Sequence, residues 1–127
     1  MSAHWASIYI GTEWARDANC WHFCARVWSE RFGVTVPMIQ VDGADPRATR
    51  RALDASPTRR GWFEVVIPIE GDGVMMAKGA MPCHVGIWLE LGGVLHCIEG
   101  AGAIFTPAER LADLGYRITG TYRRAAA

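Results

Sequence analysis

The chain has 127 residues, of which half are apolar, and its 13 basic residues balance its 13 acidic residues. This length suits one domain with a hydrophobic core and is too short for two, so we expect a single domain over residues 1–127. The balanced charge gives no overall field for nucleic acid, and no stretch approaches the roughly 20 apolar residues of a membrane span. We therefore expect no nucleic-acid partner and no membrane span.

Signals for export and for disulfide formation are weak. The segment Met1–Ser7 lacks the basic region and the apolar run of a secretory signal, which predicts a protein made in the cytoplasm that leaves by lysis or in a larger particle. Four cysteines are too sparse for a disulfide scaffold, so we interpret all four as reduced. One local excess of arginines is interpreted as a solvated surface, with polyanion binding as the alternative: Arg47, Arg50, Arg51, Arg59 and Arg60.

The first half of the chain predicts two helices. Asn19 can cap free backbone N–H groups, and Gly33 can adopt the left-handed conformation that ends a helix. Apolar residues recur between them at helical spacing, which predicts an amphipathic helix of about fourteen residues. After an extended segment, Val34–Val41, a second helix is predicted over Asp45–Ala55, because aspartate caps and the proline that follows it suits the first helical position.

The second half of the chain predicts short strands separated by glycine turns. A helical turn is expected over Pro107–Leu114. The predicted strands are Trp62–Ile69, Val74–Ala77, His84–Leu89, Val94–Ile98, a segment around Ile104–Phe105, and Tyr116–Tyr122. Helices followed by antiparallel strands indicate an α+β fold in which the N-terminal helices pack on a small, curled, antiparallel sheet.

Cys20 is the candidate nucleophile. It lies in the first turn of the predicted helix, where unpaired N–H groups and the helix dipole favour a thiolate over a thiol. A thiolate that attacks a carbonyl also needs a base, and the base needs a partner that fixes its tautomer. His22 is about 200° around the helix from Cys20, and His4 lies near the N-terminus, so neither is favoured as the base.

The remaining histidines, His84 and His96, lie on neighbouring predicted strands. If the chain reverses at Glu90, the two side chains are directly opposed, with Cβ atoms roughly 5 Å apart. If Gly92 and Gly93 form a two-residue turn instead, the histidines are about five positions out of register and do not touch. The pattern slightly favours the glycine turn, so both registers remain open at this point.

Instead of a catalytic site, these cysteines and histidines could form part of a hydrophobic core or bind a metal ion. Buried cysteines are most often small core residues, and we interpret Cys24, Cys83 and Cys97 in that way. The adjacent residues Cys83 and His84 should point to opposite sheet faces, as should His96 and Cys97, so at most one of each pair could bind zinc. We therefore expect no metal and no other cofactor. The full set of possible ligands is Cys20, His22, Cys24, Cys83, His84, His96 and Cys97.

Nearly the whole chain resembles NlpC/P60 cysteine peptidases, in particular the variants of phage tail and gene-transfer-agent clusters. The order of the segments, with cysteine first, histidine second and a polar third residue, matches this papain-like group. The segments that carry the resemblance are Tyr9–Trp14, Asn19–Phe23, Gly71–Met76, His84–Trp88, Val94–His96 and Ile104–Arg123.

The resemblance implies a Cys-His-His triad in which Cys20 is the nucleophile, His84 the general base and acid, and His96 the residue that orients His84. It favours the reversal at Glu90. It also implies roles for aromatic residues at the oxyanion and substrate sites, where Trp14 stands at the position of a hydroxyl-bearing aromatic. The residues implied for these sites are Tyr9, Trp14 and Trp21. This chain differs from the family in having Asn19 before the cysteine and Trp21-His22 after it.

The implied function is hydrolysis of amide bonds in peptidoglycan stem peptides, within a phage-tail-like or gene-transfer-agent particle that acts at the cell wall. The partners implied are the stem peptide and particle proteins. Two alternatives stay open. The first is a non-catalytic tail-assembly component that uses Trp5, Trp14 and Trp62 as contacts. The second is an acyl transferase that uses the same triad.

Overall fold

The computed structural model describes residues 4–36 and 61–125 of the chain. The predicted second helix and the arginine group lie outside these residues, as does most of the predicted segment Val34–Val41. No helix of the described part has the length and the apolar character that crossing a membrane requires.

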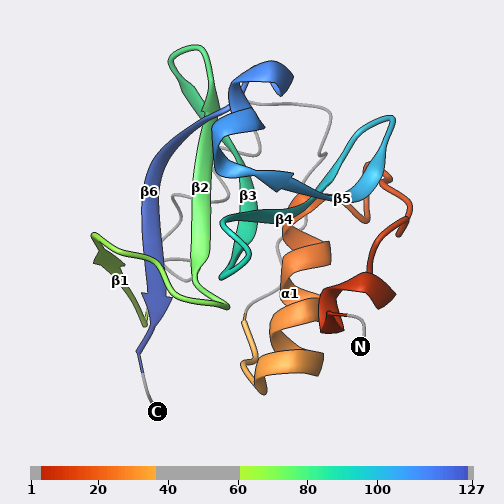
Figure 1. The fold of residues 1–127 in the computed structure, drawn as a ribbon. Coiled ribbons are helices and arrows are strands. Elements are labelled where there is room, and N and C mark those ends of the chain that lie inside the picture. Colours follow the sequence, from red (N-terminus) through yellow and green to blue (C-terminus); the bar gives the residue numbers. More distant parts are fainter. Residues whose placement is uncertain (1–3, 37–60, 126–127) are drawn as a thin grey trace.

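Within the described residues, one α-helix packs against a six-stranded antiparallel sheet (Figure 1). The strand order is β1-β6-β2-β3-β4-β5, and every neighbouring pair is antiparallel. Two short 3-10 helices flank these elements. In chain order the elements are η1 (Trp5–Ile8), α1 (Cys20–Phe32), β1 (Trp62–Val65), β2 (Gly73–Lys78), β3 (Met81–Leu89), β4 (Gly93–Ile98), β5 (Gly102–Pro107), η2 (Ala108–Leu114) and β6 (Arg117–Arg124).

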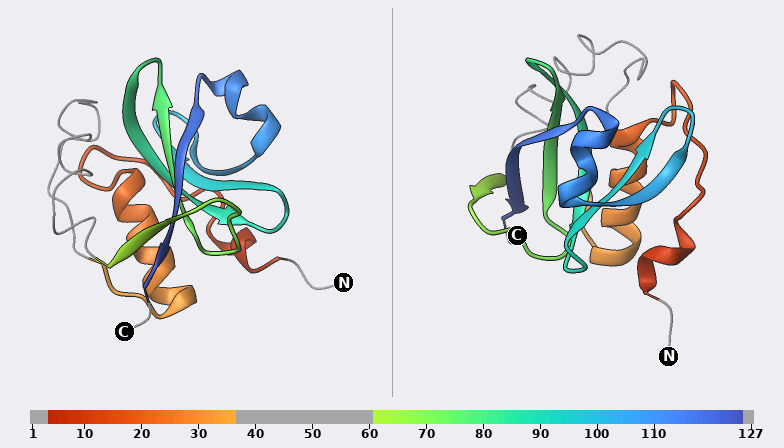
Figure 2. Two further views of the ribbon diagram at one scale, coloured as in Figure 1. Left: turned by 90° about the vertical axis from the view of Figure 1, so that its left-hand side faces the viewer. Right: turned by 45° about the horizontal axis from the view of Figure 1, so that its top comes forward.

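The sheet is curled, as the two views in Figure 2 show: the β4–β5 hairpin runs across the direction of β2 and β6. The helix α1 packs against β3 and β4. The described elements thus have the predicted α+β character, with a helix against a small, curled, antiparallel sheet.

The predicted boundaries of α1 are confirmed, because local chemistry sets both ends. The Asn19 side chain accepts the backbone N–H of Trp21 at 3.1 Å, and Gly33 ends the helix with a φ of 66°. The His22 side chain reaches back to the backbone N–H of Asn19 at 3.4 Å and completes a capping box. His22 therefore stabilises the start of the helix that carries Cys20.

Each of the six predicted strands has a counterpart among the described residues, but their lengths differ from the prediction. The first strand ends at Val65 instead of Ile69, because Pro68 has no N–H to donate and the Ile69 N–H donates to the Asp72 carboxylate at 2.8 Å. The third strand begins at Met81, three residues before the predicted start. The helical turn and the last strand lie close to their predicted positions.

Apolar residues of α1 and of the sheet form the core. Phe23, Cys24 and Val27 of α1 are buried with Ile87 of β3 and Leu95 of β4. A second, smaller cluster contains residues of β2, β4 and η2: Val74, Met76, Val94 and Leu111. Since α1 is packed along its length, the position of its first turn against the sheet is well defined.

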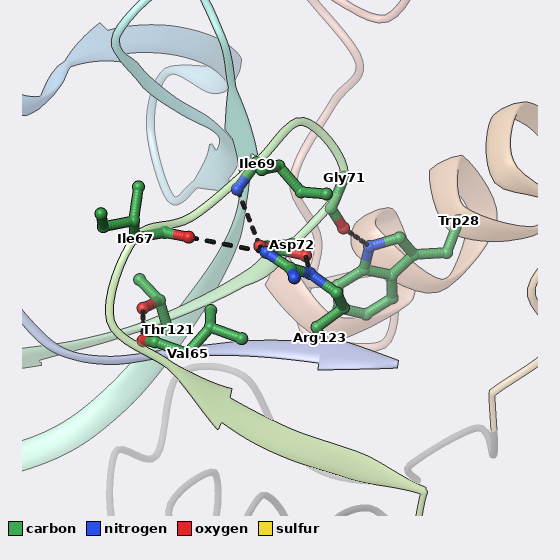
Figure 3. Close-up of polar contacts among 8 residues, drawn as sticks. All are labelled: Trp28, Val65, Ile67, Ile69, Gly71, Asp72, Thr121 and Arg123. Carbon is green, nitrogen blue, oxygen red and sulfur yellow. Dashed lines mark hydrogen bonds and ion pairs between the residues drawn. The ribbon is translucent and has the colours of Figure 1, made fainter. Parts of the chain in front are cut away.

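A partly buried ion pair joins the segment before β2 to the last strand (Figure 3). Arg123 donates to the Asp72 carboxylate through Nε at 3.0 Å and Nη2 at 2.9 Å. The Asp72 side chain is only 4% exposed and also accepts the Ile69 N–H. Beside it, the indole N–H of Trp28 in α1 donates to the Gly71 carbonyl at 2.9 Å. These contacts tie helix, loop and sheet together.

Asp72→Ala is expected to lower the free energy of unfolding by about 1–3 kcal/mol, since it removes the buried carboxylate that accepts the Ile69 N–H and Arg123 in partly buried hydrogen bonds. Urea unfolding followed by circular dichroism measures the change. Asp113→Ala is the matched control, because Asp113 pairs with Arg110 on the surface, with side chains 64% and 70% exposed, and such pairs contribute little. Equal effects of the two substitutions would contradict this assignment.

Candidate active site

Cys20 and His84 line the same pocket, which has a volume of about 330 Å³. Cys20 comes from the first turn of α1, and His84 comes from β3, one of the two strands against which α1 packs. The pocket also takes in side chains of β2, β4 and the segment after η2. Its walls include Trp14, Lys78, Cys83, Cys97, Glu99 and Tyr116.

The Cys20 thiol is protonated in the resting protein. Burial raises its pKa to about 11, against the opposing effect of backbone N–H groups of Val85 and Trp21 that favour the thiolate. Burial therefore opposes the preference for a thiolate that the helix start provides, because the side chain is almost fully buried and desolvation outweighs the local dipoles. A base must remove the proton before the sulfur can attack.

A β-bulge places His84 in the pocket. In the β2–β3 ladder Met76 pairs with His84 and Ala77 pairs with Pro82, so Cys83 is the extra residue of the bulge. Cys83 and His84 therefore both line the pocket. This corrects the prediction that these adjacent side chains point to opposite faces, since the bulge interrupts the alternation along the strand.

His84 and His96 are in direct contact: His84 Nε2 lies 2.8 Å from His96 Nδ1. Neither predicted register produces this contact. Ile87 pairs with Leu95 and Leu89 with Gly93, so a three-residue connection over 90–92 reverses the chain, and continuing this register places His96 opposite Gly86. The histidines are diagonal neighbours, which aromatic side chains can bridge.

Gly86 makes the diagonal contact possible. A Cβ atom at this position would lie 2.3 Å from Val94 Cγ1 and 3.1 Å from His96 Cβ.

The two glycines predicted to form the turn, Gly92 and Gly93, have separate roles. Gly92 adopts a φ of 97° in the connection, whereas Gly93 lies where a Cβ would be 2.3 Å from the Thr106 carbonyl oxygen of β5. Only one of them is a turn residue, which explains why a two-glycine hairpin was the wrong register.

A third polar side chain lies behind the histidines. His96 Nε2 is 2.9 Å from the Thr106 hydroxyl oxygen, and both residues are buried. Burial lowers the pKa of His96 to about 4, and burial together with His96 and Lys78 lowers the pKa of His84 well below 6.5. Both imidazoles are therefore neutral at pH 7. Sequence reasoning missed Thr106, whose only signal is a hydroxyl at the end of an apolar strand.

The ring of Tyr116 lies against the ring of His84. The two rings are stacked, with centroids 4.6 Å apart and an interplanar angle of 17°. The Lys78 ammonium lies 4.8 Å from the centroid of the Tyr116 ring, so a cation, a phenol and an imidazole form a stack at the pocket. Sequence reasoning assigned Tyr116 only to a strand, since nothing local to it indicates a contact with a residue more than thirty positions away.

The structure brings some of the residues implied by the resemblance together and leaves others apart. Trp14 lines the pocket. Trp21 is buried beside Trp28, with ring centroids 5.7 Å apart, and its side chain is not part of the pocket wall. The Tyr9 hydroxyl donates to Glu30 at 2.9 Å, and Tyr9 likewise does not line the pocket. His4 lies 3.4 Å from Glu70, in contact with η1.

The remaining cysteines are reduced: Cys24 and Cys97 are buried, and Cys83 is half-buried. Among residues 4–36 and 61–125, no three side chains of His, Cys, Asp or Glu are arranged to hold a metal ion. In the described residues, the pocket thus contains a thiol and an imidazole without a cluster of metal ligands.

Comparison with known proteins supports the fold. No family model matches the sequence, and no curated protein matches it. A crystal structure from Staphylococcus aureus subsp. aureus Mu50, described as similar to a lipoprotein of the NLP/P60 family, matches 96% of this chain with a TM-score of 0.60 and 16% sequence identity. The chain spans 39% of the length of that protein. The similarity shows a shared NlpC/P60-like fold.

Proposed function

We propose that this protein is a cysteine peptidase or amidase that hydrolyses amide bonds in peptidoglycan peptides. The observation that carries the proposal is the pocket that Cys20 and His84 share, with His84 hydrogen-bonded to His96 behind it. A thiol, a base and a group that orients the base are the three parts that nucleophilic acyl transfer requires. The shared fold with a protein described as NLP/P60 supports the same reaction class.

Proton transfer follows from the hydrogen bonds of His84. Since Nε2 is engaged with His96, Nδ1 is the ring nitrogen left to exchange a proton within the pocket. As the Cys20 sulfur bonds to the carbonyl carbon of the substrate, its proton passes to Nδ1 and the carbonyl oxygen becomes an oxyanion. The C–N bond then breaks, and the departing amine takes the proton from Nδ1.

Water completes the cycle. His84 removes a proton from water, the resulting hydroxide adds to the acyl carbon, and the C–S bond breaks to release a carboxylic acid. Cys20 then regains its proton. Each step uses the same imidazole, which is neutral at the start and at the end of the cycle.

We expect the donors for the oxyanion near the start of α1 and in the wall of the pocket. Asn19 already accepts the N–H groups of Trp21 and His22, so the backbone N–H of Cys20 is the first-turn donor that the cap leaves for the substrate. Trp14 lines the pocket, and its indole N–H is the second donor that we propose. We assign these two groups to the oxyanion site.

Incubation with defined peptidoglycan stem peptides tests the function. Mass spectrometry is expected to detect two fragments, one with a new amine and one with a new carboxylate. Iodoacetamide should abolish their formation, and a chelator should leave it unchanged. The proposal fails if no peptide is cleaved or if the chelator abolishes cleavage. A new amide formed with an added amine, without hydrolysis, would favour acyl transfer.

The setting of this activity rests on the sequence resemblance alone. Incorporation in a phage-tail-like or gene-transfer-agent particle, contacts with particle proteins and action at the cell wall remain predictions. The three tryptophans considered as contacts of a non-catalytic component are all partly buried and pack against the core: Trp5, Trp14 and Trp62.

A further inference from the structure

The hydrogen-bond chain behind the pocket has three members and ends in the protein interior. His84 Nε2 is 2.8 Å from His96 Nδ1, and His96 Nε2 is 2.9 Å from Thr106 Oγ1. His96 is fully buried and Thr106 is 6% exposed. A buried polar atom needs a hydrogen-bond partner. The positions of the protons in this hydrogen-bonded series therefore depend on its three side chains.

Two arrangements of the protons satisfy both contacts. In the first, His84 Nε2–H donates to His96 Nδ1, and His96 Nε2–H donates to the Thr106 oxygen. In the second, the Thr106 hydroxyl donates to His96 Nε2, and His96 Nδ1–H donates to His84 Nε2. Each neutral imidazole carries one N–H, so the second arrangement leaves the His84 proton on Nδ1.

Only the first arrangement leaves a base in the pocket. His84 Nδ1 then has a lone pair that can take the Cys20 proton. In the second arrangement Nδ1 already carries a proton, and His84 cannot act as the base. The side chain that accepts the His96 Nε2–H therefore decides whether His84 can act on the thiol.

We propose that Thr106 is a positioning residue whose hydroxyl oxygen accepts the His96 Nε2–H and thereby holds His84 in the tautomer with an unprotonated Nδ1. The choice of the first arrangement rests on the proposed function, because the two hydrogen bonds alone allow either arrangement. The tautomers of the two histidines can nevertheless be measured without any substrate. Thr106 acts through His96 and does not touch the reacting atoms.

The geometry of β4 and β5 explains why this position suits the role. Val94 pairs with Thr106 and His96 pairs with Ile104, so Thr106 is a diagonal neighbour of His96 on the next strand. The two hydrogen bonds, from His84 to His96 and from His96 to Thr106, thus follow the same diagonal direction across β3, β4 and β5. A residue at position 106 is held by β5 and needs no loop to place it.

The direct test is the 15N chemical shift of the histidine ring nitrogens in the wild-type protein at pH 7, measured by NMR. We expect His96 to be protonated at Nε2 and unprotonated at Nδ1, and His84 to be unprotonated at Nδ1. A wild-type protein with His96 protonated at Nδ1 overturns the proposal, and this result needs no variant and no substrate.

Variants test the consequence for catalysis. Thr106→Val keeps the shape and removes the acceptor, so we expect kcat to fall about 10- to 100-fold with little change in KM, and the ring-nitrogen shifts to change. Thr106→Ser keeps the hydroxyl and should restore both. Thr121→Val is the matched control, because Thr121 is also a buried strand threonine, with its hydroxyl donating to the Val65 carbonyl at 2.6 Å in β1.

The outcomes separate the two proposals. If the wild type cleaves peptides but Thr106→Val leaves kcat and the tautomers unchanged, Thr106 has no positioning role. Equal losses of kcat in Thr106→Val and Thr121→Val would assign the effect to stability and would also overturn the inference. If the wild type cleaves no peptide while the tautomers are as expected and change in Thr106→Val, the positioning role stands and the proposed function fails.

Discussion

Replacement of Cys20 by alanine is expected to abolish peptide hydrolysis, lowering kcat/KM by a factor on the order of 10⁴ or more. The reason is the absence of any other nucleophile in the proposed reaction. The substitution removes one sulfur atom from a side chain that is almost fully buried, so the fold should persist. Initial rates on a defined stem peptide, measured by chromatography, give the loss. The circular dichroism spectrum shows whether the variant is folded.

Cys24→Ala is the matched control for this experiment. Cys24 lies one turn further along α1, is fully buried and donates weakly to the Val85 carbonyl, with its sulfur 3.7 Å from that oxygen. Its removal costs some packing but should leave the reaction intact. Cleavage by Cys20→Ala at the wild-type rate would refute the mechanism. A similar loss in both variants would show that the effect comes from disturbed packing of α1.

The helix that carries Cys20 could be predicted from the sequence because its signals are local. Asn19, the apolar spacing and Gly33 all lie within one stretch, and each acts on its nearest neighbours. The protonation of Cys20 could not be predicted in the same way. Burial by residues distant in the sequence raises its pKa to about 11, and the helix start does not compensate.

The contact between the histidines shows where pattern reasoning ends. The pairing of β3 with β4 was predicted, but its register depends on a three-residue connection and on the close approach of β5 to Gly93. The sequences of β3 and β4 alone indicate neither the length of the connection nor the approach of β5. The bulge at Cys83 has the same origin, since it is a mismatch between β2 and β3 and belongs to neither strand alone.

Thr106 and Tyr116 were missed for a further reason. Both contact the histidines across the sheet, Thr106 through a hydrogen bond and Tyr116 by stacking. Their residue types are common in strands, so the sequence offers no contrast that separates them from ordinary strand residues. Sequence reasoning can propose a nucleophile and a base, whereas the groups that fix the base emerge from tertiary structure.

The pH dependence of hydrolysis should reflect the environment of His84. Its pKa is lowered by burial, His96 and Lys78, so the neutral base persists as the pH falls below 6.5. We expect the acid limb of kcat/KM to lie below pH 6.5 for that reason. Unfolded histidines bind protons more readily in this range, so stability also falls as the pH drops. Circular dichroism at each pH therefore separates loss of activity from unfolding.

His84→Gln is expected to lower kcat/KM by about 10² to 10⁴ and to remove this acid limb, because glutamine cannot take the proton from Cys20. Rates on the stem peptide between pH 4 and pH 9 measure both effects. His22→Gln is the control: glutamine at this third helical position can still accept the Asn19 N–H, so the cap and the reaction should both persist. An acid limb that remains in His84→Gln would assign it to another group and exclude His84 as the base.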